Sequence, residues 1–279
     1  MQILQFLWND VLIRPLVNGL FIFYEFLGHN LGVAILGFGL VLRFVLNPLT
    51  KPYMASMKKM KDYEPQLAKL REKYKDDKKQ LLTAQSDFYK QNKINPGAGC
   101  LPYLLQIVIL IALFNVFTTV LASHTSLTKL NNLLYAPLKI AANQTLNTKF
   151  LYYWDVTKPD AFSIPGIPFP LPGLFLIIAT LLQFFSAKMM APVISEEKKI
   201  AKKTESSTDD MQVAMQSSMT YMFPAMTLLF GLRFPFGLVL YWLLFSLWQV
   251  IQQYQTSGWG GLSPWLLKLR LLKSESVKR

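Results

Sequence analysis

Residues 30–49, NLGVAILGFGLVLRFVLNPL, contain one charged side chain, Arg43, in a run of otherwise apolar and small residues. A helix needs about 20 mostly apolar residues to cross a hydrocarbon core about 30 Å thick. The stretch therefore predicts a membrane-spanning helix. Arg43 stands eight residues before Lys51, or roughly 12 Å along a helix from that boundary, so the charge lies well inside the span.

The composition of the whole chain favours an integral membrane protein. Of the 279 residues, 52% are hydrophobic and 16% are charged. In soluble domains roughly 25% of the residues are charged. The single cysteine, Cys100, excludes a disulfide framework. With only His29 and His124 beside it, no metal site and no cofactor are expected. The net charge of +13 comes without any nucleic-acid-binding signature.

Three further apolar runs, Leu101–Leu121, Leu171–Met190 and Met219–Ile251, predict four further spans. The run from Met219 to Ile251 is too long for one crossing and divides at residues 233–237, where Pro235 and Gly237 favour a tight turn. We therefore predict an all-α integral membrane fold with five transmembrane helices. Its parts are an N-terminal interfacial amphipathic helix (1–27), the first span (28–52), a cytoplasmic helical hairpin (53–96), the second span (97–121), an outer loop (122–169), the third span (170–191), a cytoplasmic loop (192–217), the fourth span (218–233), the fifth span (236–256) and a cytoplasmic tail (257–279).

The distribution of basic residues predicts the orientation. The hairpin with Lys51 at its edge, the loop after the third span with Lys188 before it, and the tail hold 22 lysines and arginines, and the opposite side holds five. Because basic residues concentrate in cytoplasmic loops, we expect the N-terminus outside and the C-terminus in the cytoplasm. The location that fits is a bacterial plasma (inner) membrane, crossed several times.

Two segments outside the spans have alternative interpretations. Residues 1–27 predict a helix in the membrane interface, with Leu4, Leu7, Trp8, Val11 and Leu12 toward lipid; a short extra span is the alternative. In residues 53–96, Leu67, Leu70 and Tyr74 recur at helical spacing, which favours two antiparallel arms over a solvated linker. Pro65 is expected to kink or restart the first arm.

The predicted spans offer Arg43 no carboxylate, because none of them contains Asp or Glu. Snorkelling of Arg43 to the interface is one interpretation. A hydrated groove is the other, because polar residues form stripes on several spans. The candidate groove residues are Arg43, Asn47, Gln106, Gln183, Trp242, Ser246 and Gln249.

Methionines gather toward the cytoplasmic side, where an adaptable apolar surface would suit varied substrates. Ordinary lipid contact explains them equally well. The candidates for cytoplasmic substrate contact are Met54, Met57, Met60, Met215 and Met219.

Five strings in this order resemble the YidC family of membrane insertases, which includes the mitochondrial oxidase-assembly and chloroplast albino proteins. They are LRFVLNPL (42–49), LREKYKDDK (70–78), NPGAGCLPYLLQ (95–106), FLYYWD (150–155) and FPFGLVLYW (234–242). The resemblance covers nearly the whole chain and is to the compact form, without the large outer domain of Gram-negative members. The outer loop is longer than in compact members, and the tail has only five basic residues, so a strong ribosome-binding tail is not expected.

The resemblance implies a non-enzymatic insertase and chaperone with a groove open to the cytoplasm and to lipid. Arg43 would be the groove arginine, Gln106 a groove-lining glutamine and Trp242 an aromatic that contacts the incoming segment. The implied partners are nascent membrane proteins, the ribosome, the Sec translocon, the signal recognition particle pathway and the lipid bilayer, with no specific nucleic acid. An assembly chaperone acting only beside the Sec translocon stays an alternative. A small-molecule transporter is a further one, although no inverted repeat or intramembrane carboxylate supports it.

Overall fold

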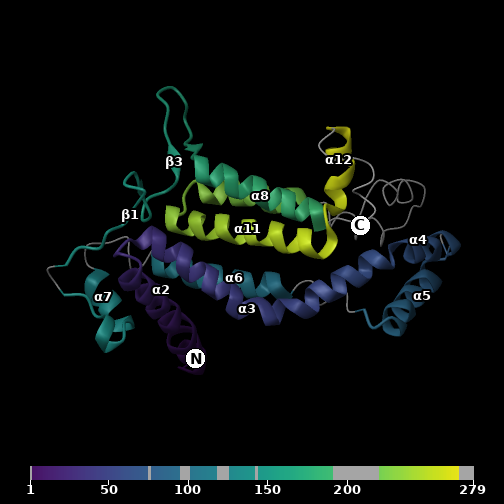
Figure 1. Ribbon diagram of the computed structural model, residues 1–279, viewed down its shortest axis with the longest axis horizontal. Helices are drawn as coiled ribbons and strands as arrows, with labels where there is room; N and C mark the ends of the chain where they lie inside the picture. Colours follow the sequence, from purple (N-terminus) through teal and green to yellow (C-terminus); the bar gives the residue numbers. More distant parts are fainter. Residues whose placement is uncertain are drawn as a thin grey trace. The chain divides into compact units, whose positions relative to one another are not determined.

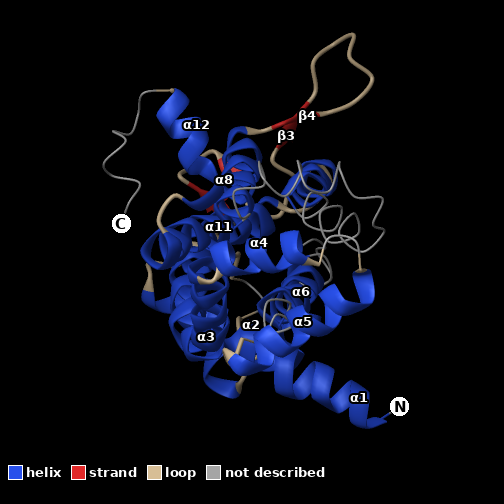
Figure 2. Ribbon diagram, turned by 90° about the vertical axis from the view of Figure 1, so that its right-hand side faces the viewer, coloured by secondary structure: helices blue, strands red, loops and turns tan. Residues whose placement is uncertain are grey.

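The protein is mostly helical, with two small two-stranded sheets (Figures 1 and 2). The computed structural model describes residues 2–74, 77–94, 101–117, 126–141, 144–190 and 220–269. The chain divides into two compact units, and each is described by itself. Unit 1 comprises Met1–Leu46, Leu104–Thr180 and Met226–Ser246, and unit 2 comprises Asn47–Tyr103, Leu181–Ala225 and Leu247–Arg279.

The helices and strands follow one another as Figure 1 labels them. They are α1 (Gln2–Phe6), the π-helix η1 (Leu7–Ile13), α2 (Arg14–Phe26), α3 (Leu31–Asp62), α4 (Glu64–Lys73), α5 (Lys78–Gln91), α6 (Leu101–Asn115), α7 (Ser126–Leu133), the short 3₁₀ helix η4 (Ala136–Leu138), β1 (Lys149–Phe150), β2 (Trp154–Asp155), β3 (Ala161–Phe162), β4 (Leu171–Pro172), α8 (Leu174–Met190), a helix over 220–231, α11 (Phe236–Ser257), η5 (Gly260–Leu262) and α12 (Ser263–Lys268).

Two helical stretches among the described residues are long and apolar enough to cross a membrane, Leu31–Thr50 and Phe236–Thr256. Two shorter apolar helices, Gln106–Asn115 and Leu174–Met189, fall below that length. Parts of the predicted second, third and fourth spans, at 97–100, 118–121, 191 and 218–219, lie outside the described residues. The count of five spans therefore stays a prediction.

The N-terminal helical segment packs into the core of unit 1 by its second half. In α2, the side chains of Leu16, Val17, Leu20 and Phe21 are buried. A polar contact adds to this packing: Asn18 Nδ2 donates to the Leu133 carbonyl, and Asn18 Oδ1 accepts from the Tyr135 amide, at 2.8 and 2.6 Å.

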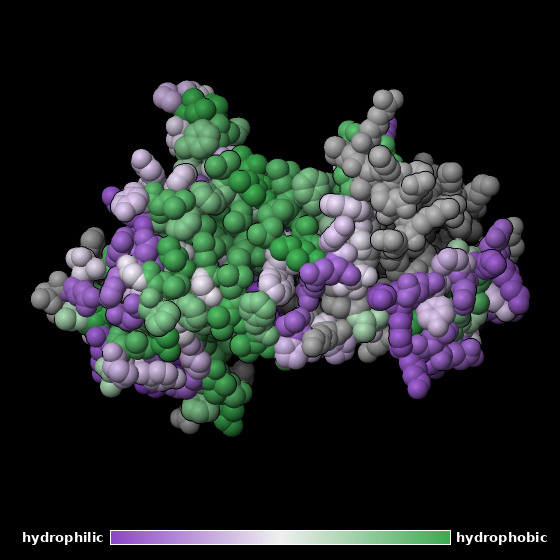
Figure 3. Space-filling model, in the orientation of Figure 1, coloured by the Kyte–Doolittle hydropathy of each residue, from purple (hydrophilic) through white to green (hydrophobic). Residues whose placement is uncertain are grey.

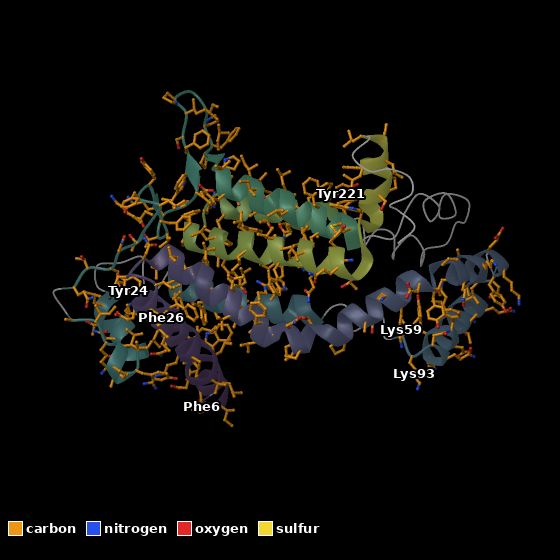
Figure 4. All side chains as sticks on the ribbon, viewed as in Figure 1. Phe6, Tyr24, Phe26, Lys59, Lys93 and Tyr221 are labelled. Atoms are coloured by element: carbon orange, nitrogen blue, oxygen red, sulfur yellow. The ribbon has the colours of Figure 1, made fainter. Side chains whose placement is uncertain are left out.

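The segment has a mixed exposure, with exposed apolar residues at both ends, including Ile22 and Phe26 of α2. Leu7 and Val11 are exposed, as Phe6 is in Figure 4, whereas Trp8 and Leu12 pack against the core cluster. The side chain of Leu4 lies outside the described residues. Apolar side chains are favoured both in a protein core and in lipid. The sequence therefore could not show which face of this segment packs against the protein.

The loop before α8 holds the N-terminal ends of two helices. The carbonyls of Lys158 and Val156 accept from the amides of Phe236 and Gly237 at the start of α11, at 2.7 and 2.8 Å. The buried Asp160 carboxylate accepts from the Leu176 amide in the first turn of α8 at 2.8 Å. Because the first amides of a helix have no partner within the helix, this loop supplies part of what both helices lack.

The Asp160 cap gives a pH-dependent prediction. Burial raises the pKa of the Asp160 carboxyl above its ordinary value, and the backbone amides of Leu176 and Phe175 oppose that rise. A raised folded-state pKa means that the contribution of Asp160 to stability is full below the ordinary pKa of about 4. It is lost as the pH rises through the raised value. Asp160→Asn keeps an acceptor for the Leu176 amide and should remove this pH dependence.

The check is the thermal midpoint in detergent between pH 4 and 7. We expect the stability of Asp160→Asn relative to the unsubstituted protein to increase with pH. Asp160→Ala should be less stable than Asp160→Asn by roughly 1 kcal/mol at every pH, as expected for a lost cap. Equal midpoints for the Ala and Asn variants would contradict the capping role.

In unit 2, the helices α4 and α5 pack against each other after the chain turns at Tyr63. Pro65 occupies the first turn of α4, where the missing amide costs no hydrogen bond. Leu67 and Leu81 are buried, and the rings of Tyr63 and Phe88 meet edge to face at 5.6 Å. Lys59 of α3 and Lys93 after α5 are labelled in Figure 4.

Candidate functional site

In unit 1, Arg43 of α3 contacts residues from two other helices. Its Nη2 donates to Oε1 of Gln106 on α6 at 3.0 Å. Its guanidinium carbon lies 3.6 Å from the ring centroid of Phe245 on α11. The Tyr241 hydroxyl also donates to Gln106 Oε1, at 3.4 Å. The arginine is therefore stacked on one aromatic face and oriented by an amide that a tyrosine holds in place.

The charge of Arg43 is oriented here but not neutralised. Among the residues that the structure describes, no carboxylate forms an ion pair with it. Two buried donors, Arg43 Nε and Gln106 Nε2, have no hydrogen-bond partner within that same part of the chain. Unpaired buried donors are costly, and a carboxylate, which only accepts, is the kind of group that would satisfy them.

Small residues let the helices of unit 1 approach closely around Arg43. A Cβ on Gly39, one turn before Arg43, would lie 2.7 Å from Leu244 Cδ2. Beside Gln106 and the Tyr241 hydroxyl, the guanidinium meets the apolar ring of Phe245, and the Arg43 side chain is partly withdrawn from water. In such surroundings a charge interacts more strongly with an opposite charge than it does in water.

The other two groove candidates of unit 1 are on α11. Ser246 is buried. Trp242 lies 5.7 Å from the ring of Phe234, which in turn contacts Phe230 and Phe114. The structure thus places Trp242 in an aromatic cluster beside the turn before α11, and the ring stacked on Arg43 is that of Phe245.

The remaining groove candidates belong to unit 2 and form separate polar pairs. Gln252 Nε2 donates to Asn47 Oδ1 at 3.2 Å. Ser186 Oγ donates to Gln249 Oε1 at 3.4 Å. Gln183 Oε1 is buried without a partner among the described residues. Asn47 and Gln249 thus each pair with a polar side chain outside the candidate set, and Gln183 pairs with no described residue.

The structure describes none of the five methionine side chains proposed for substrate contact. Met215 and Met219 lie outside the described residues, as do the side chains of Met54, Met57 and Met60. Substrate contact by these methionines stays a prediction.

Tyr241 and Phe245, which sequence reasoning missed, form one i, i+4 pair on α11. An aromatic residue in an apolar span gives no sign of whether it faces lipid or a cation. The sequence did contain one indication that another helix lies close to Arg43. On α3, Gly32, Leu36, Gly39 and Arg43 lie on one face, and glycines on a helix face indicate close approach by another helix.

If the chain inserts membrane proteins, as the sequence resemblance implies, Phe245→Leu should weaken its response to acidic substrate segments. A cation–π contact contributes about 0.5–2 kcal/mol, so we expect the effect of the substrate's acidic residues on insertion rate to fall roughly 2- to 30-fold. Phe245→Tyr should retain it. Phe26→Leu, at an exposed phenylalanine of α2, is the matched control. Insertion kinetics in proteoliposomes measure the effect, and a Phe245→Leu rate equal to that of the control would contradict it.

Comparison with known proteins settles the family. The family model described as "60Kd inner membrane protein" matches residues 22–259. The chain belongs to this family. The 60Kd inner membrane protein family is named for its location in an inner membrane, in agreement with the membrane protein that the composition predicts.

Curated relatives in this family have the same printed name, membrane protein insertase YidC. The protein from Pelobacter propionicus is 33% identical over 256 residues, covering 90% of this chain and 39% of the relative. That from Chlorobium luteolum is 32% identical over 257 residues, covering 91% and 38%. That from Geobacter sulfurreducens is 29% identical over 247 residues, covering 88% and 37%. The chain thus spans about two fifths of the length of these relatives.

A solved structure shares the fold. It is described as an active YidC insertase crystal structure with the first transmembrane domain resolved, and it matches with a TM-score of 0.52 at 22% identity. The match covers 89% of this chain and 47% of that chain. The family fold thus extends over most of this chain.

Proposed function

We propose that this chain is a membrane protein insertase that moves short polar segments of nascent membrane proteins across a bilayer and releases their apolar helices into lipid. The proposal includes the five spans, the N-terminus outside and the C-terminus in the cytoplasm. It rests on membership of the 60Kd inner membrane protein family and on the surroundings of Arg43.

The observation on which the proposal depends is that Arg43 forms no ion pair with a carboxylate of the described residues. Its guanidinium is stacked on Phe245 and bonded to Gln106, while Arg43 Nε and Gln106 Nε2 have no described partner. An acidic residue of a substrate would bring the missing acceptor and the missing counter-charge together. Arg43, Gln106, Trp242 and Ser246 would thus line a hydrated groove.

The energetic basis is solvation. Each unsatisfied polar group in lipid costs several kcal/mol (roughly), so a polar segment crosses more easily where water and hydrogen-bonding side chains reach into the membrane. The polar residues Asn47, Gln183 and Gln249 of unit 2 would offer further hydrogen-bonding partners. Burial of the substrate's apolar helix in lipid would supply the driving force, so no nucleotide is required.

The shortness of the predicted fourth span would lower the barrier to crossing further. Residues 219–232 number 14, which spans roughly 21 Å as a helix against a core of about 30 Å. Local thinning of the bilayer accommodates such a mismatch. A thinner core shortens the path of the polar segment.

The test is reconstitution of the purified chain with one small substrate that has a short acidic outer segment. Protease protection of that segment measures insertion, with empty liposomes as the control. Insertion into proteoliposomes that contain only this chain is expected. Insertion that needs added Sec translocon would instead favour the assembly-chaperone alternative, and solute flux without insertion would favour a transporter.

A further inference from the structure

The β3–β4 hairpin is an uncharged, apolar projection of unit 1. Residues 161–172 read AFSIPGIPFPLP, in which Ser163 is the one polar side chain. Strand β3 pairs with β4 through Ala161 with Pro172 and Phe162 with Leu171. Residues 162–170, here called the hairpin tip, are all exposed. Figures 1 and 2 both show the hairpin standing away from the helices of unit 1.

The large apolar side chains of this tip are exposed. Phe162 is 52% exposed and Phe169 is 59% exposed, and Ile164 and Ile167 are exposed as well. The preceding part of the loop differs in character, because it holds Lys149, Asp155 and Lys158. Contiguous exposed apolar side chains indicate a surface that binds something other than water.

The backbone of the hairpin is suited to lipid. Four of its twelve residues are prolines, namely Pro165, Pro168, Pro170 and Pro172, and a proline has no amide donor to leave unsatisfied. The Ile167 amide donates to the Ile164 carbonyl at 3.1 Å. Gly166, at φ +91°, allows the tight turn.

The apolar surface continues from the hairpin onto α8. No Asp, Glu, Lys or Arg occurs from Ala161 to Ala187. Leu174, Ile177 and Ile178, which follow directly in α8, are exposed apolar residues of the predicted third span. Figure 3 shows apolar side chains gathered over α8.

The base of the hairpin is tied to the same helix. Asp160, immediately before β3, caps the first turn of α8, and a Cβ on Gly173, immediately after β4, would collide with the Asp160 carboxylate. The Gly173 amide donates to the Asp160 carbonyl at 2.8 Å. The hairpin is therefore held at the N-terminal end of a helix whose exposed face is apolar.

We propose that the hairpin tip is immersed in the lipid of the adjacent leaflet, as an anchor at the outer end of α8. The lipid-facing surface of α8 would continue into it without a polar break. The proposal goes beyond the insertase function and does not depend on it, because it requires only that the chain lies in a membrane.

The test uses spin labels at single cysteines in proteoliposomes that contain this chain alone. Cys100, the one native cysteine, is replaced by serine, and cysteine is placed at Phe162 or at Phe169. Ile177→Cys gives the lipid reference. Thr145→Cys, at an exposed polar position of the outer loop, gives the aqueous reference. Collision rates with oxygen, which partitions into lipid, and with a water-soluble nickel chelate are measured for each label.

We expect both tip labels to give an oxygen-to-nickel collision ratio near that of Ile177 and several-fold above that of Thr145. A second substitution, Ile164→Asp, should move the ratio of the Phe169→Cys label toward the Thr145 value. Tip ratios equal to that of Thr145 would overturn the proposal and would show that the tip lies in water, free for a partner protein. Two label positions guard against failure of one variant to fold, which thermal midpoints would reveal.

Discussion

Arg43→Ala is expected to abolish insertion of substrates with acidic outer segments, while Arg43→Lys largely retains it. At an effective dielectric of about 20, two unit charges 4 Å apart attract each other by about 4 kcal/mol, which is roughly a thousandfold in rate if it is expressed in the crossing step. Lysine keeps the charge, although it loses the planar stacking that Arg43 makes on Phe245. Protease protection of the outer segment in proteoliposomes measures the effect.

The substrate supplies the matched control for this experiment. When its acidic outer residues are replaced by asparagine or glutamine, the difference between the unsubstituted protein and Arg43→Ala should largely disappear. Thermal midpoints must show that the variant is folded, because Gln106 Oε1 loses one of its two donors. If Arg43→Ala inserts acidic substrates at the normal rate, the charged-groove mechanism is wrong.

Removal of α4 and α5 should block insertion while leaving unit 1 folded. None of the residues 64–91 belongs to unit 1, and the buried contacts of Leu67 and Leu81 lie within unit 2. A short glycine–serine linker in place of residues 64–91 therefore removes the proposed cytoplasmic hairpin without opening the core of unit 1. The expected loss is complete for every substrate, acidic or neutral, because the hairpin would act before the polar segment meets Arg43.

A variant with a weakened hairpin interior refines that result. Leu81→Ala removes a buried side chain and should lower insertion, whereas Leu82→Ala, at the exposed neighbour on the same helix, should not. Insertion assays and thermal midpoints are compared for the three variants. Unimpaired insertion by the linker variant would reject a role for α4 and α5.

Much of the helical arrangement follows from local sequence. The break at residues 232–235 coincides with Pro235, which cannot continue the preceding helix. The new helix after Tyr63 coincides with Pro65, which fits a first turn. The structure also brings Arg43 and Gln106 into contact, two residues that the sequence had assigned to one groove.

The rest depends on which face of an apolar helix meets protein. From the sequence, Tyr241 and Phe245 could not be distinguished from aromatic residues that face lipid. The buried face of α2 has the same apolar residue types as a face in contact with lipid. Capping of α8 by Asp160 joins residues 16 positions apart, and no periodicity within either element indicates it. The groove function of Arg43 stays a prediction until the insertion assay is done.

The caps on α11 have a consequence for how this chain tolerates evolutionary change. Val156 and Lys158 hold the helix through main-chain carbonyls, so the cap does not depend on the side chain of Lys158, whereas the side chain of Val156 is fully buried in the core and must stay apolar. Chain length there cannot vary as freely, because one inserted residue would shift both acceptors out of register. We therefore expect relatives to vary at position 158, to keep an apolar residue at position 156, and to gain or lose residues elsewhere in the loop.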